Sequence, residues 1–456
     1  MDQFVINGGS RLHGRLTIKG SKNAALPLMA AALLTDRPLL LNDVPDLADI
    51  RNMVKLLQEL GCHVDFAPPP DATFAGGKMV IHSQDESASH ARYDIVKTMR
   101  ASICTLGPML ARRGFARVSM PGGCAIGDRP VDLHLHGLRA LGAEIQLHQG
   151  DIVARVPGGK GGRLRGGRVF LGGPFGSTVL GTANVMSAAT LAEGQTMIEC
   201  AACEPEIVDL AKMLNAMGAR VRGAGSPRIT IDGVETLGGT EHAVIPDRIE
   251  AGTYMIAAAA TNGDVTLDNC PMDAMIATCD ALSRIGVILS EEKGPATAGR
   301  DPMRTTVRVT CSRLLQPIEV TTQPHPGFPT DVQAQLVALL TMAEGNSVVT
   351  ERIYPERFLH VAELGRMGAK VLRQGPTAII SGVKRLVGAP VMASDLRASA
   401  CLVIAGLAAE GSTTVSRVYH LDRGYERMEE RLRLLGADIQ RVSEKQGATA
   451  AEAVAV

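Results

Sequence analysis

The chain has 456 residues, and its 47 lysines and arginines are balanced by 47 aspartates and glutamates, which gives a formal net charge of zero. This balance argues against a nucleic-acid binder, which would carry a strong positive field, and the 3% of aromatic residues without a tryptophan argues against base stacking. No apolar run approaches the roughly 18 residues that a membrane span needs. Nine scattered cysteines and the lack of a basic-then-apolar leader predict a cytoplasmic protein without a disulfide framework.

A repeated unit organises the chain. Each repeat closes a helical pattern and opens a strand-like one at a glycine, and these glycines are Gly61, Gly142, Gly218, Gly286, Gly368 and Gly436. Each unit is predicted to contain a helix, a tight turn, a short strand such as Thr196–Glu199, a second helix, a glycine cap and a closing strand. Strands that alternate with helices predict an α/β or α+β fold.

Six units most simply form two lobes of three, and a single solenoid is the alternative. A lobe boundary is expected near residues 243–248, with a matching crossing near residues 18–21 if the first strand belongs to the second lobe. We therefore predict one lobe from residues 22–246 and another from residues 1–21 with 247–442, and a flexible tail from residues 443–456. Two thin connections between lobes imply a hinge and a cleft.

The segment Gly20-Ser21-Lys22-Asn23 precedes an Ala/Leu-rich helix. Free backbone N–H groups, the positive end of the helix dipole and the Lys22 ammonium together favour an anion site. The alternative is that Ser21 or Asn23 only caps the helix and that Lys22 is solvated.

Cys124 lies in a glycine-rich stretch that Arg129, Asp132 and His134 follow closely. Glycines around one thiol leave the backbone free to adopt unusual conformations, and the charged groups are well placed to act on the thiol. We interpret Cys124 as a chemically active residue. The alternative is an ordinary surface turn in which the cysteine only fills space.

Arginines stand beside local breaks in the predicted elements, namely Arg100, Arg129, Arg397 and Arg423. A planar guanidinium suits a phosphate or carboxylate because it offers two parallel hydrogen bonds. A single arginine is more often part of a surface ion pair, but Arg100, Arg397 and Arg423 stand near helix starts in separate units and could converge on one cleft. Asp331 follows two prolines at the start of another helix, where it is either a general base facing the cleft or only a helix-start residue.

No metal site is expected. Cys200 and Cys203 have a metal or redox spacing, but no second pair accompanies them. His134 and His136 with Asp132 are interpreted as ordinary polar contacts.

These motifs, in this order, resemble the enolpyruvyl transferase family, in particular the UDP-N-acetylglucosamine 1-carboxyvinyltransferases. The resemblance runs from about Phe4 to Val442, and its motifs are Lys22-Asn23, Thr98-Met99-Arg100-Ala101-Ser102, the glycine-cysteine loop through His134, Phe328-Pro329-Thr330-Asp331, Asp395-Leu396-Arg397 and Asp422-Arg423-Gly424-Tyr425-Glu426. It implies a two-lobed inside-out α/β barrel of six βαβαββ-type units. It also implies transfer of the enolpyruvyl group of phosphoenolpyruvate to the 3′-hydroxyl of UDP-N-acetylglucosamine, with release of phosphate and without a metal or organic cofactor.

The resemblance also implies roles for individual residues. Cys124 would protonate the methylene carbon of phosphoenolpyruvate and would react with an epoxide inhibitor of the fosfomycin type, while Asp331 would take the hydroxyl proton. The phosphate and carboxylate would be held by Lys22, Arg129, Arg397 and Arg423. Asn23 would contact the sugar or the tetrahedral intermediate. The site for the nucleotide sugar would be lined by Arg100, Arg129, Pro130, Val131, Asp132, Leu133 and Ile353. Its diphosphate would be contacted by Gly176, Ser177, Thr178 and Val179.

Two departures from the family pattern stand out. Asp128 adds a negative charge where the family often has a small residue, and Thr178-Val179-Leu180-Gly181 replaces a more usual Val-Gly-Ala sequence, which weakens the transfer of the diphosphate contacts. Three alternatives are weighed: the sister enzyme that acts on shikimate 3-phosphate, a non-catalytic regulator that binds nucleotide sugar, and a thiol hydrolase. The sister enzyme lacks the cysteine loop, and a thiol hydrolase has no use for the arginines.

Overall fold

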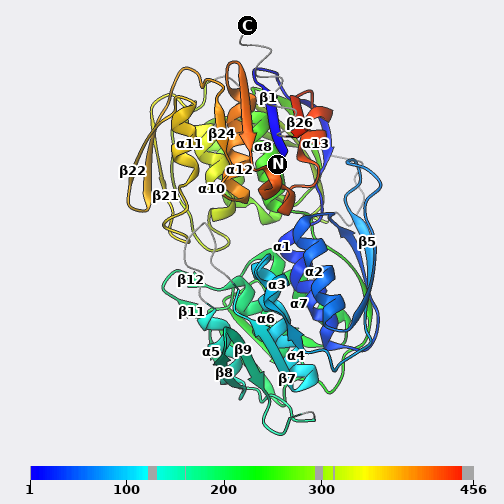
Figure 1. The fold of residues 1–456 in the computed structure, drawn as a ribbon. Helices are drawn as coiled ribbons and strands as arrows, with labels where there is room; N and C mark the ends of the chain where they lie inside the picture. The colour runs from blue at the N-terminus through cyan, green and yellow to red at the C-terminus, as the bar shows by residue number, and fades with distance from the viewer. Residues whose placement is uncertain (1, 122–130, 160, 293–300, 312–313, 444–456) are drawn as a thin grey trace.

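The structure is a computed structural model that describes residues 2–121, 131–159, 161–292, 301–311 and 314–443. The ribbon separates into two bodies, one above the other (Figure 1). Each body has its own hydrophobic core. One core is built from residues between Ala24 and Val244, and the other combines residues between Phe4 and Ile18 with residues between Ile249 and Ile439. We call these bodies the first lobe and the second lobe.

Six four-stranded sheets form among the described residues, three in each lobe. Every sheet has one parallel pairing and two antiparallel pairings. The third unit shows the common order of elements: β10 (Arg168–Phe170), α6 (Val179–Ala189), β13 (Gln195–Glu199), α7 (Pro205–Ala216), β14 (Arg220–Arg222) and β15 (Arg228–Asp232). Its chain order is therefore strand, helix, strand, helix, strand, strand.

The rest of the first lobe follows the same plan. Its first unit contains α1 (Lys22–Ala31), η1 (Ala32–Leu34), β3 (Leu39–Val44), α2 (Ala48–Glu59), β4 (Cys62–Ala67), β5 (Gly77–Ser83) and β16 (Thr240–Ala243). Its second unit contains β6 (His90–Ala91), α3 (Tyr93–Val96), η2 (Arg100–Thr105), α4 (Leu106–Arg113), β7 (Phe115–Ser119), α5 (Asp132–Ala140), β8 (Glu144–His148) and β9 (Asp151–Arg155). A small hairpin, β11 (Gly172–Gly173) with β12 (Gly176–Ser177), precedes α6.

The second lobe holds the fourth, fifth and sixth units. The fourth contains β2 (His13–Thr17), α8 (Arg248–Ala260), β17 (Asp264–Cys270), η3 (Met272–Ala274), α9 (Ile276–Ile285), β18 (Val287–Glu291) and β19 (Thr305–Cys311). The fifth contains β20 (Glu319–Thr321), α10 (Thr330–Leu340), β21 (Asn346–Thr350), α11 (His360–Arg366), β22 (Lys370–Gln374) and β23 (Thr377–Ser381). The sixth contains β24 (Pro390–Met392), α12 (Leu396–Ala408), β25 (Ser412–Ser416), η4 (Val418–Arg423), α13 (Met428–Leu434), β26 (Asp438–Ser443) and β1 (Asp2–Asn7).

Three strands close their sheets across long stretches of chain. In the first lobe, β16 pairs in parallel with β3, about 200 residues earlier in the sequence. In the second lobe, β1 lies between β25 and β26, and β2 pairs with β17. The two chain segments that join the lobes touch at an isolated bridge between Gly20 and Pro246. These pairings join the beginning and the end of each lobe, whereas the repeats of a solenoid contact only their neighbours along the chain.

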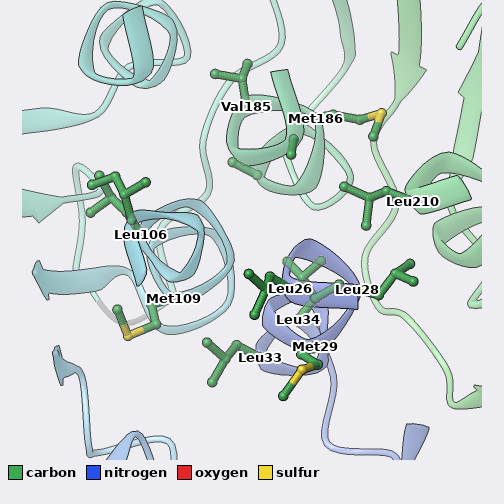
Figure 2. Packing of buried hydrophobic residues seen from close by; sticks show 14 of the residues in the cluster. Leu26, Leu28, Met29, Leu33, Leu34, Leu106, Met109, Val185, Met186 and Leu210 are labelled. Carbon is green, nitrogen blue, oxygen red and sulfur yellow. The ribbon is translucent and has the colours of Figure 1, made fainter. Parts of the chain in front are cut away.

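The helices at the centre of each lobe are buried on nearly all sides. Nine of the ten residues of α1 are buried, and its leucines with those of η1 pack near Leu106 and Met109 of α4 and Leu210 of α7 (Figure 2). The sheets bury one face and expose the other, as the alternating pattern of β4 and β5 shows. The six repeat glycines have positive φ values between 82° and 107° and follow the second helix of each unit, as the repeat predicts.

Each of the six sheets stays open within the described residues, so no closed barrel is formed there. No helix in the same part of the chain is long and apolar enough to cross a membrane. The predicted tail, residues 443–456, lies outside the described residues except for its first residue.

Candidate active site

The N-termini of four long helices meet at the interface between the lobes. Asn23, in the first turn of α1, donates from Nδ2 to Oδ2 of Asp331 at 3.5 Å, and Asp331 lies in the first turn of α10. Arg397, in the first turn of α12, is 3.1 Å from the same oxygen. Asp247 caps the N-terminus of α8 and acts electrostatically on Arg397. The positive ends of these helix dipoles therefore favour negative charge at this interface.

Asp49 joins two of the predicted cations. Lys22 Nζ is 3.0 Å from one carboxylate oxygen of Asp49, and Arg423 Nε is 2.9 Å from the other. Lys22 and Asp49 belong to the first lobe, whereas Arg423 belongs to the second. Burial acts to raise the pKa of Asp49, but the charges of Lys22 and Arg423 prevail and lower it below its ordinary value. Asp49 is therefore an ionised, interlobe bridge.

Asp331 has three partners. Its Oδ1 accepts from Arg357 Nη1 at 2.8 Å, and its Oδ2 accepts from Arg397 at 3.1 Å and from Asn23. Burial acts to raise the pKa of Asp331, yet the two guanidinium groups hold it well below its usual range. The carboxylate is thus charged at neutral pH, and it is a weak base while both arginines remain on it.

Tyr425 ties the three central helices of the second lobe together. Its hydroxyl oxygen accepts from Arg397 Nη1 of α12 at 3.0 Å and from Gln335 Nε2 of α10 at 3.1 Å, and it lies 2.9 Å from Thr253 Oγ1 of α8. The ring also faces the Arg397 guanidinium, 5.5 Å from its centroid. Burial raises the pKa of the phenol, so Tyr425 stays neutral and fixes the orientation of Arg397.

Two carboxylates thus share four basic side chains, Lys22 and Arg423 on Asp49 and Arg357 and Arg397 on Asp331. Arginine forks match the geometry of carboxylates and phosphates, and the helix N-termini add further N–H donors. A small ligand with two anionic groups could therefore replace part of these internal pairs. Such a site can bind, orient and stabilise negative charge between the lobes.

Residues predicted to line a nucleotide sugar lie at element starts in the first lobe. Val131 precedes α5, which begins at Asp132, and a side chain at Gly173 of β11 would meet Leu133. Gly176 and Ser177 form β12, and Thr178 caps α6 by accepting from Gly181 N at 3.2 Å, before Val179 begins the helix. A side chain at Gly176 would meet Pro324 of the second lobe, so this hairpin also reaches the interface.

Ile353 lies in a loop that Glu351 braces. Buried Glu351 accepts from the backbone N–H groups of Ile353 and Tyr354, at 2.8 and 2.9 Å, and also from Thr330 Oγ1 at the start of α10. The loop is thereby fixed next to Asp331. Arg100 begins η2 in the first lobe and is partly buried.

Cys124, Arg129, Pro130 and Asp128 lie outside the described residues. No group of three or more potential metal ligands occurs in the described part of the chain. His134 is buried, and its Nδ1 lies 3.1 Å from Asn184 Nδ2, an ordinary polar contact as predicted. Cys200 and Cys203 are both free, partly buried thiols.

The sequence interpretation missed Asp49, Arg357, Glu351 and the role of Tyr425. Tyr425 stands inside the motif that predicts Arg423 as a binding residue, so its neighbourhood is a usable signal. Asp49 and Arg357 gave none, because a charged residue near a helix start is common and only the approach of another unit gives it a partner.

Comparisons with known proteins agree along almost the whole chain. The sequence profile of the EPSP synthase family (3-phosphoshikimate 1-carboxyvinyltransferase) matches residues 6–432. A UDP-N-acetylglucosamine 1-carboxyvinyltransferase of Methylacidiphilum infernorum is 49% identical over 446 residues, which are 98% of this chain and 100% of that protein. The protein of the same name from Myxococcus xanthus is 50% identical, with 97% of this chain and 99% of that protein covered.

Solved structures show the same fold. The enolpyruvyl transferase NikO from Streptomyces tendae superposes with a TM-score of 0.83 at 24% identity, covering 97% of this chain and 99% of that one. EPSP synthase from Acinetobacter baumannii gives 0.73 at 20% identity, covering 97% and 100%. From the family profile and the relatives near 50% identity, the chain belongs to the EPSP synthase family, among its UDP-N-acetylglucosamine 1-carboxyvinyltransferases.

Proposed function

We propose that this enzyme transfers the enolpyruvyl group of phosphoenolpyruvate to the 3′-hydroxyl of UDP-N-acetylglucosamine and releases phosphate, the first committed step of peptidoglycan biosynthesis. The observation that carries the proposal is the pair of clusters at the interface between the lobes, in which Lys22 and Arg423 share Asp49 while Arg357 and Arg397 share Asp331. Phosphoenolpyruvate has a phosphate and a carboxylate, and the relatives near 50% identity carry this activity in their names.

The proposed reaction is an addition followed by an elimination. The sugar hydroxyl gives its proton to Asp331 and attacks C2 of phosphoenolpyruvate, while Cys124 adds a proton to C3. In the second step C3 returns a proton to the Cys124 thiolate, the C–O bond to phosphate breaks with its electron pair leaving on the phosphate, and the double bond of the enol ether forms. The departing phosphate takes the proton held by Asp331, so both residues return to their starting states. The cationic side chains stabilise the oxocarbenium-like state and the departing phosphate.

The internal pairs give the base a way to become active. Asp331 is a weak base while Arg357 and Arg397 donate to it. When the anionic groups of phosphoenolpyruvate take up these arginines, Asp331 loses its stabilising partners and its affinity for a proton rises. Proton transfer from the sugar hydroxyl is thus favoured only after both substrates are present.

The remaining predicted residues belong to the same proposal. Cys124 is the proton donor and the residue that an epoxide of the fosfomycin type alkylates. Arg129 binds the phosphate together with Lys22. Asn23 contacts the sugar or the intermediate, next to its hydrogen bond with Asp331. The binding site for the nucleotide sugar is lined by Arg100, Arg129, Pro130, Val131, Asp132, Leu133, Gly176, Ser177, Thr178, Val179 and Ile353.

We extend the proposal to the architecture and the compartment. Residues 22–246 and residues 1–21 with 247–442 are the two domains, and in each of them three sheets surround central helices as an inside-out α/β barrel. This arrangement is supported by the two cores and by the buried α1, α8, α10 and α12. The eight described cysteines are free thiols, which supports a reducing cytoplasm.

Phosphate release from phosphoenolpyruvate tests the function, with UDP-N-acetylglucosamine as acceptor and shikimate 3-phosphate in parallel. Release with the nucleotide sugar alone is expected. Release with the shikimate ester alone would assign the chain to the sister activity. No release, from a protein that still binds the nucleotide sugar, would favour a regulator.

Two substitutions test the role of Cys124. Cys124→Ala removes the acid and little volume, so turnover is expected to fall by about 100-fold or more while the melting temperature stays unchanged. Cys124→Asp replaces one proton donor by another, so it is expected to retain activity and to resist epoxide alkylation, followed by mass spectrometry. Full turnover by the alanine variant would contradict the assignment.

A further inference from the structure

Residues 423–426 of the second lobe run alongside residues 46–49 of the first lobe. At one end Arg423 Nε meets Asp49 Oδ1 at 2.9 Å. At the other end Glu426 Oε2 accepts from the backbone N–H of Asp46 at 2.7 Å. The two contacts are three residues apart on each segment, so together they fix which residues face one another.

Glu426 is almost fully enclosed by further contacts with the crossing between the lobes. Its Oε1 is 3.1 Å from Lys19 Nζ in an ion pair, and only 2% of each side chain is exposed. The Lys19 ammonium also contacts the Phe74 carbonyl oxygen of the first lobe, and the Lys19 backbone N–H donates to Glu250 of α8 at 2.7 Å. Glu426 is thus joined to both lobes and to the segment that connects them.

The segment around Glu426 also positions a second arginine. Tyr425, its immediate neighbour, accepts from Arg397, which reaches Asp331 with its other terminal nitrogen. A shift of this segment would therefore disturb the cations of both carboxylate clusters. Within the described residues, the Glu426 carboxylate itself contacts Asp46 N and Lys19.

We propose that Glu426 is a positioning residue for the transfer reaction: its buried carboxylate sets the register in which Arg423 meets Asp49, so that Arg423 and Lys22 are presented together to the anionic substrate. The inference rests on the proposed function for the identity of that substrate. Its physical basis is the hydrogen bond from Asp46 N, because a buried carboxylate with an N–H donor and an ammonium holds a single geometry.

The test compares three variants by steady-state kinetics with each substrate varied in turn. Glu426→Ala removes the acceptor for Asp46 N, and the KM for phosphoenolpyruvate is expected to rise about tenfold or more, while that for the nucleotide sugar changes less than about threefold. Glu426→Gln keeps an acceptor oxygen and is expected to restore most of the loss. Glu429→Gln is the matched control, since Glu429 is a buried carboxylate of α13 paired with Arg441.

A merely structural role would lower the melting temperature and leave the ratio of the two KM values unchanged. That result, or a glutamine variant no better than alanine, would overturn the proposal. If Glu426→Ala does not fold, Glu426→Asp replaces it, because the shorter side chain keeps the charge but does not reach Asp46 N, and the same selective rise is expected.

Calorimetric titration with phosphoenolpyruvate separates this inference from the proposed function. If the wild-type enzyme shows no turnover, the function fails, yet weaker phosphoenolpyruvate binding by Glu426→Ala than by Glu429→Gln would still support the positioning role. Equal binding by the two variants would contradict it, whatever the wild-type enzyme does in the turnover assay.

Discussion

Asp49 and Asp331 each allow two basic side chains to lie close together. Lys22 and Arg423 would repel each other without Asp49, and Arg357 and Arg397 would do so without Asp331. The same carboxylates make the site responsive, because each anionic group of a ligand competes with a carboxylate that is already in place.

Replacing Asp331 by asparagine is expected to lower kcat by about 100-fold or more, since the amide cannot take a proton from the sugar hydroxyl.

The same substitution also tests the ion pairs of Asp331. The folded-state pKa of Asp331 is depressed, so its ionised form stabilises the fold above the unfolded-state pKa of about 3.9, and this stabilisation is lost as the pH falls through the folded-state pKa. Asp331→Asn should therefore melt below the wild type at neutral pH, with the gap closing in acid. A constant gap would contradict the ion-pair account.

Glu204 gives the opposite pH dependence. Its Oε1 accepts from the backbone N–H of His325 across the lobe interface, and its buried Oε2 has no hydrogen-bond partner in the described residues. Burial raises the pKa of Glu204, and nearby Arg248 offsets this only in part, while Glu206 adds to it.

A raised pKa means that the contribution of Glu204 to stability is full below the unfolded value of about 4.3 and is lost as the pH rises through the folded value. The melting temperature of Glu204→Gln should thus be above that of the wild type at about pH 8 and equal to it at about pH 4. Exposed Glu319 provides the control, since Glu319→Gln should follow the wild type throughout. If Glu204→Gln melted above the wild type only in acid, the raised pKa of Glu204 would be contradicted.

At the scale of elements, Asn184 is a buried connector between helices. From α6 its Oδ1 accepts from Gly107 N of α4 at 2.6 Å, and its Nδ2 donates to the Ile103 carbonyl of η2 at 2.9 Å and lies near His134 of α5. A side chain at Gly107 would collide with Asn184, so the two helices approach closely only because this position is a glycine.

Asn184→Ala leaves buried backbone groups without partners, and a loss of about 2 kcal/mol in the free energy of unfolding is expected, measured by urea denaturation. Asn7→Ala is the comparison, because Asn7 makes its hydrogen bond to Asp438 at the surface and should change stability by less than about 0.5 kcal/mol. Similar losses in both variants would argue against the connector role.

The repeat predicted most of the elements, since glycine caps and helical periodicity are local signals. The mixed α/β class is confirmed. Local signals do not predict how the first and last strands of each lobe pair with the rest of their sheets. The pairing of β16 with β3 and of β1 with β25 depends on contacts between distant parts of the chain. At the site, helix starts indicated Lys22 and Arg397, whereas Asp49 acquires a role only when the other lobe supplies Arg423.

At the scale of the whole molecule, the two connections between lobes form a narrow, tightly packed junction. Gly20 bridges to Pro246, and Ser21 N donates to the Ile245 carbonyl at 2.7 Å. A Cβ atom at Gly20 would overlap the Asp43 carbonyl oxygen of β3, so any larger residue must displace one connection.

Gly20→Ala is therefore expected to lower the melting temperature and to reduce kcat/KM about tenfold or more, because the lobes carry opposite halves of the site. Gly365 in α11 is the matched control: a Cβ there meets nothing within 4 Å, so Gly365→Ala should be stabilising by roughly 0.5–1 kcal/mol at unchanged activity. Unchanged activity in Gly20→Ala would show that the lobe arrangement tolerates a shifted junction.

The pairing of the first strands with the last also sets the order in which the sheets can form during synthesis. Once the chain has emerged from the ribosome as far as Ala243, the end of β16, every sheet of the first lobe has all its strands. By contrast, β1 and β2 emerge first and find their partners late, since β2 waits for β17 and β1 waits for β25 and β26. Residues 2–7 are thus paired long after they are made, and the sheets of the second lobe have all their strands only after β26 has emerged.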